Sequence, residues 1–537
     1  MMLEHLSERC LYLYSISRCT LSYLLVLVRM GAILPRSAPG KQPAFFISRQ
    51  AMFISPRRES DPAQKKHKQH CWECRRHRLV CDFTRPKCQR CSANGIACPG
   101  YDDAKPLLWL EPNRSTRKRR SRSDREEKMM VEKAIAPRIQ NIQLRTDISA
   151  VFEAAEYYNT CIYPETLPIC DLGPNPHVYR LSPIHLQNVP QRPDHVRLAF
   201  VCMILSHRIN RTRDDPQSHA LGVTLYRYRD LAIRSLREHI IAGDQGNRDI
   251  IIASVIAFLL ADAQQDGLRN WQWHLEGARK LIKLRGGIHA LAKIQPLEQL
   301  LCCFIFLAVI GNTTSPASDL TMAASHLADL DFIVTLNSNP IFPIQLCPPV
   351  LLGEIIKINH VRMRATTEGG RPDILHEAYA LLNSIDSFSA EKWASTKPSS
   401  NEEWELAGNT YQAAVALYCI SSLQSLSVLP RVRSVTRTQC LYGFLKQALS
   451  SPRLNRTLLW PLVVLGMDAV RGSIAMRGFV VKQLAEMSRK AGTHVPLTAI
   501  HVLQEFWKSG ETAWDACFNR PYAFVTQIAL NTRPIRT

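Results

Sequence analysis

The spacing of apolar residues predicts helices along most of the chain. From about residue 148 onward, apolar positions recur every three to four residues, whereas strands of alternating Val, Ile and Thr are scarce. The strongest helical patterns are Leu221–Ala242, Ile250–Ala263, Leu297–Ile310, Leu351–Met363, Ile374–Phe388, Trp404–Leu426 and Thr498–Ser509. We therefore expect one large all-α domain over residues 148–537.

Boundary residues and apolar content refine two of these helices. Pro296 precedes Leu297–Ile310 and Gly311 follows it. Proline is common in the first turn of a helix and glycine just past its end, so this helix is predicted to stop at Gly311. Ile250–Ala263 is too apolar for a surface helix and is expected to be buried.

The first 66 residues lack a helical pattern. Arg18 and Arg29 enclose a charge-free apolar run of ten residues, but a membrane span needs about 20 and no clear signal-peptide cleavage site follows. Residues 35–69 are rich in Pro, Ser and basic residues, which is typical of loops. We expect a poorly structured, disordered extension over residues 1–66, and a start of translation at Met30 or Met52 is left open.

Residues 101–147 are predicted to form a disordered basic linker. Five basic residues lie there within six positions: Arg117, Lys118, Arg119, Arg120 and Arg122. Such a run is typical of nuclear import signals or phosphate contacts, and a merely solvated linker is the alternative. No coiled coil is expected, because Asp124–Ala136 covers barely two heptads before Pro137.

The composition and charge favour a globular protein with a polyanionic partner. Of 537 residues, 46% are apolar and 21% charged, which argues against a fibrous, wholly disordered or disulfide-stapled chain. Lys and Arg exceed Asp and Glu by 21, which favours nucleic acid, or less often an anionic membrane, as partner. Nearly half of the excess lies between Arg57 and Lys128, where 20 Lys and Arg accompany 10 Asp and Glu.

Six of the 17 cysteines lie in this basic segment. Their spacing is Cys71-x2-Cys74-x6-Cys81-x6-Cys88-x2-Cys91-x6-Cys98. Thiolates are favoured zinc ligands, and a structural zinc takes four of them in a tetrahedron. Six thiolates can therefore hold two zinc ions only if two of them bridge, and the symmetry of the two halves makes Cys71 and Cys88 the natural bridges. The module, residues 67–100, is too small to bury a core, so the metal must stabilise its fold.

The other eleven cysteines are scattered, mostly in or beside apolar runs. There a free thiol behaves as a small hydrophobe. A secreted protein would be expected to pair its cysteines, so we expect reduced core thiols in a cytosolic or nuclear protein. These residues are Cys10, Cys19, Cys161, Cys170, Cys202, Cys302, Cys303, Cys347, Cys419, Cys440 and Cys517.

The run Cys-Trp-Glu-Cys-Arg-Arg-His-Arg-Leu-Val-Cys-Asp over residues 71–82, with Pro86 ahead of Cys88, resembles the fungal zinc binuclear cluster (Zn2Cys6) transcription regulators. The resemblance implies two short helices around two zinc ions, with the first helix directed into the DNA major groove at a CGG triplet. It implies DNA contacts from Arg75, Arg76, His77 and Arg78. His77 stands where the family usually has Arg or Lys, and Val80 where it usually has Lys.

Two further motifs extend the resemblance to the helical part. The run Trp271–Gly287 resembles a signature of the family's helical regulatory domain, and Trp460-Pro461-Leu462-Val463-x-x-Gly466 resembles a second one. Together with Gly100-Tyr101 and Pro106-Leu107-x-Trp109, the pattern is similar to regulators of the acriflavine-sensitivity-control type. It implies a fungal-specific transcription factor domain after the linker.

Two other functions fit the motifs less well. His274-x-Glu276 is similar to part of the zinc-deaminase signature, but it follows the cysteines instead of preceding them, and a six-thiolate cluster offers no open coordination position. We expect His274 to pack in the core with Trp271 and Leu275. An RNA-binding zinc protein would interleave stacking aromatics, and only Trp72 and Phe83 lie near the cysteines.

The sequence thus predicts a nuclear, non-enzymatic, zinc-dependent transcription factor. It is expected to read CGG-type half-sites in double-stranded promoter DNA and to regulate transcription by RNA polymerase II. Expected protein partners are co-regulators or the transcription machinery, with no membrane. Homodimerisation is left open, because no coiled coil is evident.

Overall fold

The computed structural model describes two compact units of the chain. The cysteine module is described at residues 71, 74, 81–84, 86–93, 95 and 98. The helical domain is described at residues 148–173, 179–187, 189–212, 217–242, 248–264, 271–338, 346–369, 371–431 and 435–525. The predicted extension over residues 1–66 and linker over residues 101–147 lie outside the described residues, so these boundaries stay predictions.

The second unit is all-α, as the apolar spacing predicts, and no strand occurs among its described residues. Its α-helices are α5 (Tyr163–Cys170), α6 (Pro183–Leu186), α7 (Asp194–Arg211), α8 (Gln217–Ala242), α9 (Arg248–Gln264), α10 (Trp271–Leu284), α11 (Ile288–Ala292), α12 (Gln295–Thr313), α13 (Ala323–Ala328), α14 (Leu330–Ser338), α15 (Pro349–Glu368), α16 (Pro372–Ser387), α17 (Ala390–Ala394), α18 (Asn401–Ser425), α19 (Val435–Ala448), α20 (Leu459–Asp468), α21 (Ile474–Ala491), α22 (Val495–Ser509) and α23 (Trp514–Cys517). A π-helical turn, Tyr158–Ile162, precedes α5.

All seven predicted helices are present, with small shifts of their ends. α8 ends at Ala242 and α22 at Ser509, as predicted, but each begins three or four residues earlier than expected. α9 is buried along Ile250–Leu260, which confirms that this apolar stretch is a core helix. Such differences arise because helix termini are set by tertiary packing and capping as well as by local pattern.

The prediction that Gly311 ends α12 is wrong. Proline does lie in the first turn, but the helix continues through Gly311 to Thr313. A Cβ atom at position 311 would lie 2.6 Å from the Trp271 ring. Glycine at this position therefore lets Trp271 of α10 pack closely against α12, and it does not end the helix.

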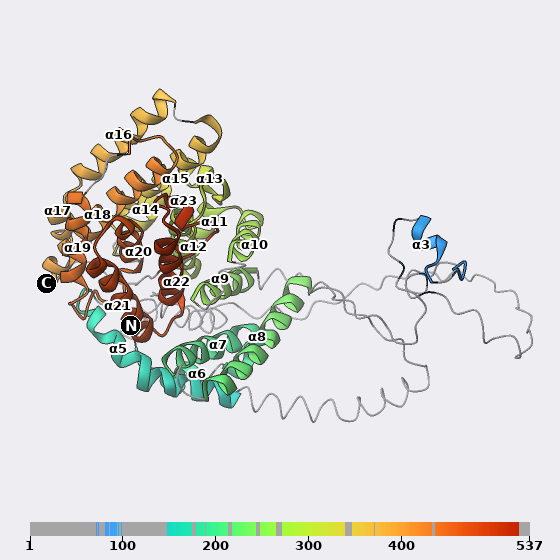
Figure 1. The fold of residues 1–537 in the computed structure, drawn as a ribbon. Coiled ribbons are helices and arrows are strands. Elements are labelled where there is room, and N and C mark those ends of the chain that lie inside the picture. The colour runs from blue at the N-terminus through green and yellow to red at the C-terminus, as the bar shows by residue number, and fades with distance from the viewer. Residues whose placement is uncertain are drawn as a thin grey trace, which may run out of the picture. The chain divides into compact units, whose positions relative to one another are not determined.

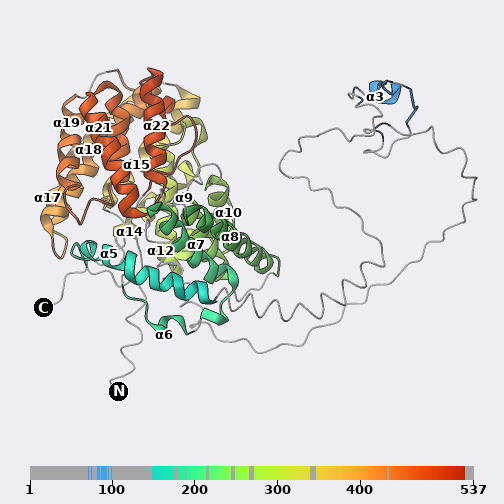
Figure 2. The ribbon, with the colours of Figure 1, turned by 60° about the horizontal axis from the view of Figure 1, so that its bottom comes forward.

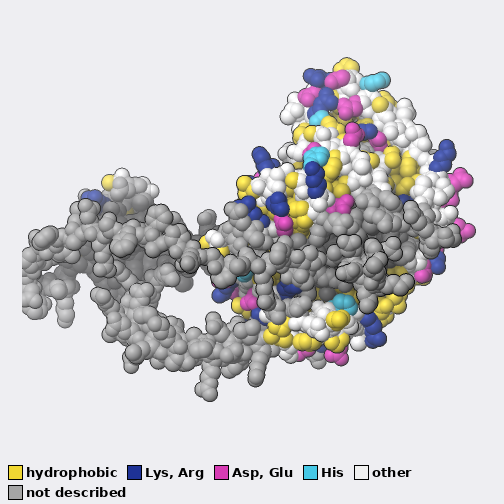
Figure 3. Space-filling view, turned by 180° about the vertical axis from the view of Figure 1, so that it is seen from behind, with side chains coloured by type: hydrophobic (Ala, Val, Ile, Leu, Met, Phe, Trp, Pro, Cys, Tyr) yellow, Lys and Arg dark blue, Asp and Glu magenta, His cyan; other side chains and the backbone are white. Residues whose placement is uncertain are grey.

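The core is built around α12 and α20, which Figure 1 shows in the middle of the domain. Every residue from Leu297 to Ile310 with a described burial is buried or nearly so, and so is Leu459–Met467. Figure 2 shows α7, α8, α9 and α10 together at one end of the domain, and α18, α19, α21 and α22 together at the other. On the face in Figure 3, apolar, cationic and anionic side chains are interspersed.

Both tryptophan motifs contact the C-terminal end of α12, the segment Gly311–Ser315, which we call the α12 terminus. Trp271 packs against Gly311, and Trp460 Nε1 donates a hydrogen bond to Thr313 Oγ1 at 2.7 Å. Trp514 Nε1 donates to the Thr313 carbonyl oxygen at 2.7 Å. The Trp514 bond satisfies a carbonyl that the helix end leaves unpaired. The contacts of Trp271 and Trp460 with this segment give the two motifs a structural role in the domain.

Most of the scattered cysteines that the structure describes are buried thiols, as expected, but Cys161 and Cys170 are half-buried and Cys440 is exposed. Cys202, Cys302, Cys303, Cys347, Cys419 and Cys517 are buried, and no described cysteine forms a disulfide. Burial raises the pKa of the Cys302 thiol well above its ordinary value. Within the described helices, none is both long and apolar enough to cross a membrane.

Candidate metal centre

The six cysteines of the module come together in a single cluster. Their side chains are at most 9% exposed, although the surrounding module offers almost no apolar core. The sulfur atoms form two groups of four, each with all members within 4.8 Å of one another. The groups are Cys71, Cys74, Cys81, Cys88 and Cys71, Cys88, Cys91, Cys98. They share Cys71 and Cys88, the same pair that the sequence symmetry singles out.

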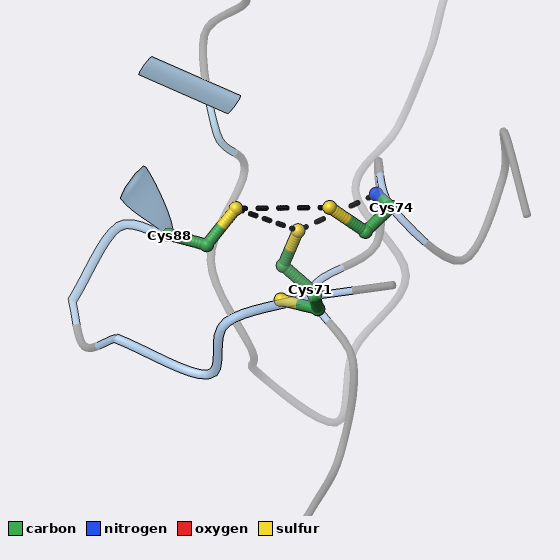
Figure 4. Close-up of side chains that lie close together, drawn as sticks. Cys71, Cys74 and Cys88 are labelled. Carbon is green, nitrogen blue, oxygen red and sulfur yellow. Dashed lines mark hydrogen bonds between the residues drawn. The ribbon is translucent and has the colours of Figure 1, made fainter. Parts of the chain in front are cut away.

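The sulfur spacing fits tetrahedral zinc. Four sulfurs at about 2.3 Å from a zinc ion lie about 3.8 Å from one another. Cys71 Sγ lies 3.6 Å from Cys88 Sγ and 3.8 Å from Cys91 Sγ, and Cys74 Sγ lies 3.7 Å from Cys88 Sγ. Figure 4 shows the sulfur atoms of Cys71, Cys74 and Cys88 directed toward one another. The donor set is all thiol, which is the chemistry of a closed structural zinc site.

Backbone hydrogen bonds repeat in the two halves of the cluster. Cys74 N–H donates to Cys71 Sγ at 3.4 Å, and Cys91 N–H donates to Cys88 Sγ at 3.3 Å. Each two-residue spacing thus forms a tight turn in which the second cysteine donates to the sulfur of the first. A donor aimed at a sulfur stabilises negative charge on it, and in both halves the accepting sulfur is the one common to the two groups.

Asp82 links the two halves of the cluster, a role that the sequence pattern does not predict. Asp82 Oδ2 accepts from Gln89 N–H at 2.8 Å and from Thr84 Oγ1 at 3.0 Å. Gln89 begins α3 (Gln89–Ala93), so Asp82 satisfies a backbone donor at the start of this helix. Usual capping spacing would not reveal this contact, because seven residues separate the partners. Phe83, at a positive φ of 61°, packs against the cysteines.

The environment of the thiols opposes their ionisation in the absence of metal. Burial raises the pKa of the Cys71 and Cys74 thiols and raises that of Cys91 to about 12. Metal binding must therefore displace protons from neutral thiols. The positive charge of the zinc ions then stabilises the negative charge of the six thiolates.

The residues predicted to contact DNA lie outside the described part of the module. Arg75, Arg76, His77 and Arg78 lie outside the described residues, and so do the basic residues 117–122 and Trp72. In the helical domain, Trp271, Leu275, Ala278 and Ile282 form the buried face of α10, and His274 is half-buried beside them. Among the described residues, the groups able to hold a metal all come from the six cysteines.

Two family comparisons match most of the chain. Residues 69–107 match the family described as the fungal Zn(2)-Cys(6) binuclear cluster domain, and residues 155–520 match the fungal specific transcription factor domain. The module accordingly binds two zinc ions and binds DNA. No solved structure matches the chain.

Two relatives are transcriptional or metabolic regulators by name. The phomenoic acid biosynthesis cluster-specific transcriptional regulator of Leptosphaeria maculans is 42% identical over 493 residues, which cover 88% of this chain and 92% of the relative. Arginine metabolism regulation protein II of Saccharomyces cerevisiae is 43% identical over 42 residues, which cover 8% of this chain and 4% of that protein. These matches identify a regulator of transcription and not an enzyme.

Proposed function

Because the chain belongs to the fungal zinc binuclear cluster transcription regulators, we propose that it reads CGG-type half-sites in promoters and regulates transcription by RNA polymerase II in the nucleus. The single observation that carries the proposal is the closed cluster of six thiols within the basic segment of the chain. Zinc that is coordinated by four thiolates has a structural role. The Lys and Arg residues around the cluster can bind the phosphates of DNA.

All six cysteines are the proposed zinc ligands: Cys71, Cys74, Cys81, Cys88, Cys91 and Cys98. Cys71 and Cys88 bridge the two ions, because they belong to both four-sulfur groups. The proposed organisation is the extension 1–66, the zinc module 67–100, the linker 101–147 and the regulatory domain 148–537. The proposed protein partners are co-regulators of transcription. If the chain forms a homodimer, the dimer does not form through a coiled coil.

Arg78 is proposed to read a guanine. It lies seven residues after Cys71, near the end of the helix that the family directs into the major groove. Arginine paired with guanine O6 and N7 contributes about 1–3 kcal/mol of discrimination. Arg78→Ala is therefore expected to weaken binding to a CGG duplex by that amount while leaving a scrambled duplex nearly unchanged. Binding titrations on both duplexes measure the difference.

Arg75→Ala provides the matched control for this titration. Arg75 and Arg76 lie earlier in the same segment and are the proposed phosphate contacts, with His77 as a further donor to base or phosphate. Phosphate contacts position the protein without reading sequence, so Arg75→Ala should weaken both duplexes together and reduce the salt dependence. If Arg78→Ala weakens both duplexes equally, Arg78 contacts phosphate and does not read sequence.

The basic run is proposed to direct nuclear import. Replacing Arg117, Lys118, Arg119 and Arg120 with alanine is expected to move a fluorescent fusion of the full chain into the cytoplasm. Zinc content should stay at the wild-type value, because the run lies outside the cysteine cluster. Arg122 is the remaining basic residue of the run. Unchanged nuclear fluorescence would assign import to another segment, such as the lysines at 65, 66 and 68.

The target genes are proposed to belong to one biosynthesis cluster. This extends to the chain what the name of its Leptosphaeria maculans relative says of that protein. Genome-wide mapping of bound sites tests the proposal. Enrichment of CGG-containing promoters in one group of adjacent genes is the expected result, and sites scattered evenly over unrelated genes contradict it.

A further inference from the structure

An apolar stripe runs along the solvent side of α8. Val223, Tyr226, Ile233 and Ile240 follow one another at intervals of three, seven and seven residues, and between 44% and 69% of each residue is exposed. The apolar residues that α8 buries lie on another face of the helix: Leu225, Tyr228, Ala232 and Leu236. One face therefore packs on the domain, and the second apolar face is solvent-exposed. Exposed apolar patches of this kind mark interaction sites.

The stripe leads into a pocket between three helices. Ile240 of α8, Ile251 and Ile252 of α9, and Leu281 and Leu284 of α10 line a cavity of about 250 Å³. Leu284, which lines the pocket, is 81% exposed, and Ile241, next to Ile240 in the sequence, is 72% exposed. Figure 3 shows apolar, cationic and anionic side chains along the lower edge of the domain, where Figure 1 shows α6, α7 and α8. We call the stripe and pocket together the α8–α10 surface.

Arginines border the α8–α10 surface. They are Arg227, Arg234 and Arg237 on α8 and Arg248 and Arg285 at the pocket. Asp230 pairs with Arg234, and Asp249 Oδ1 pairs with Arg285 at 2.8 Å. Within the described part of the chain, Arg227, Arg237 and Arg248 form no ion pair, although the carboxylate of Glu238 is exposed on the same helix. The border is therefore cationic overall.

We propose that the α8–α10 surface binds an acidic amphipathic helix of a partner protein. Apolar side chains of that helix, spaced by three, four and seven residues, would pack along the stripe, and one of them would enter the pocket. Carboxylates on its flanks face the unpaired arginines. This assigns a surface to the co-regulator contact proposed above, on which it rests.

A second copy of the chain fits this surface less well. Asp230 and Arg237 follow Val223 at intervals of seven residues, along the same side of α8 as the stripe. In a parallel pair of α8 helices, each would therefore face the same residue of the copy, Asp230 against Asp230 and Arg237 against Arg237. In an antiparallel pair centred on the stripe, Arg227 lies opposite Arg234. Both symmetric arrangements bring like charges together. DNA would satisfy the arginines but not the exposed apolar side chains.

Fluorescence anisotropy of the full-length zinc-loaded protein tests the proposal without DNA, so failure to read CGG does not affect the result. The probe is a labelled peptide of about 18 residues, roughly five helical turns, made of Glu and Ala with Leu at helical spacing. A matched peptide carries Lys in place of Glu. Leu284→Asp and Arg237→Glu are each expected to weaken binding of the acidic peptide roughly tenfold, because the first puts a charge in the pocket lining and the second turns a cation that faces the peptide carboxylates into an anion.

Ile474→Asp is the matched control, because Ile474 is 88% exposed on α21, away from the pocket. It should bind the acidic peptide as wild type does, and circular dichroism should show all variants folded. The proposal is overturned if the Glu and Lys peptides bind equally well. It is also overturned if the Leu284→Asp variant binds the acidic peptide as the wild type does. Sedimentation showing a dimer that Leu284→Asp dissociates overturns it too, since the surface then binds a second copy.

Discussion

Replacing Cys71 or Cys88 with alanine is expected to abolish zinc binding by the module, whereas Cys98→Ala should retain about one zinc ion per chain. The two shared cysteines belong to both four-sulfur groups, and Cys98 belongs to only one. Loss of Cys98 leaves the group of Cys71, Cys74, Cys81 and Cys88 complete. Loss of a shared cysteine leaves each group with three thiols.

The expected effect is large because zinc replaces a hydrophobic core here. Structural zinc sites contribute roughly 10–16 kcal/mol of binding free energy near neutral pH, and that energy is also folding energy. Beyond the cysteines, Phe83 is the only hydrophobic side chain among the described residues that packs against the cluster. The Cys71→Ala and Cys88→Ala modules should therefore lose DNA binding together with zinc.

Metal analysis of the purified full-length chain measures the outcome. Cys440→Ala is the matched control, since Cys440 is an exposed cysteine outside the cluster, and it should retain two zinc ions. Equal zinc loss in the Cys71 and Cys98 variants would contradict the bridged arrangement. So would a wild-type content of one zinc, or a nitrogen ligand in X-ray absorption spectra.

The cysteine module can be predicted from the sequence because all six cysteines lie within one short segment, Cys71–Cys98. The symmetry of the two halves makes Cys71 and Cys88 the natural bridges, and both sulfur groups contain this pair. The contact of Asp82 with the start of α3 could not be predicted, because it depends on how the chain returns between Cys81 and Cys88. The DNA-contacting role of Arg75–Arg78 stays a prediction.

The helical domain is predicted in class and in its main helices, but not in its packing. Apolar periodicity locates helices because each must bury one face. Gly311 shows the limit of this reasoning: the residue suits a helix end, yet contact with a tryptophan 40 positions away keeps it within α12. Long-range polar contacts are equally invisible to local pattern, and Arg362 is the main case.

Arg362→Met is expected to destabilise the helical domain by about 3–5 kcal/mol, the usual effect of removing one partner of a buried ion pair. The guanidinium is fully buried. Its Nη1 donates to the Asn312 carbonyl at 3.0 Å and to Tyr418 Oη at 3.1 Å. Its Nη2 donates to the Ser315 carbonyl at 2.9 Å and to Asp515 Oδ1 at 2.8 Å. One side chain thus ties α15 to the α12 terminus, α18 and α23.

The electrostatics explain why a buried cation is tolerated there. Burial alone lowers the pKa of Arg362, but Tyr418 and Asp515 raise it, and the net shift is upward. Burial raises the pKa of Tyr418 to about 12, so its hydroxyl stays neutral and also donates to Asn359. Methionine would fill much of the space but leave the Ser315 carbonyl without its guanidinium donor, which is costly in a buried site, whereas backbone N–H groups still donate to the Asn312 carbonyl.

Urea unfolding of the full chain, followed by tryptophan fluorescence, measures the effect, since Trp460 and Trp514 lie at the α12 terminus. Asp515→Asn should cost less than Arg362→Met, because the amide oxygen can still accept from the guanidinium. Arg371→Met is the matched control: Arg371 is exposed and pairs with Asp373 at the surface, so its loss should leave the midpoint unchanged. If Arg362→Met unfolds at the wild-type urea concentration, the four hydrogen bonds do not hold the domain together, and packing around the tryptophans alone must do so.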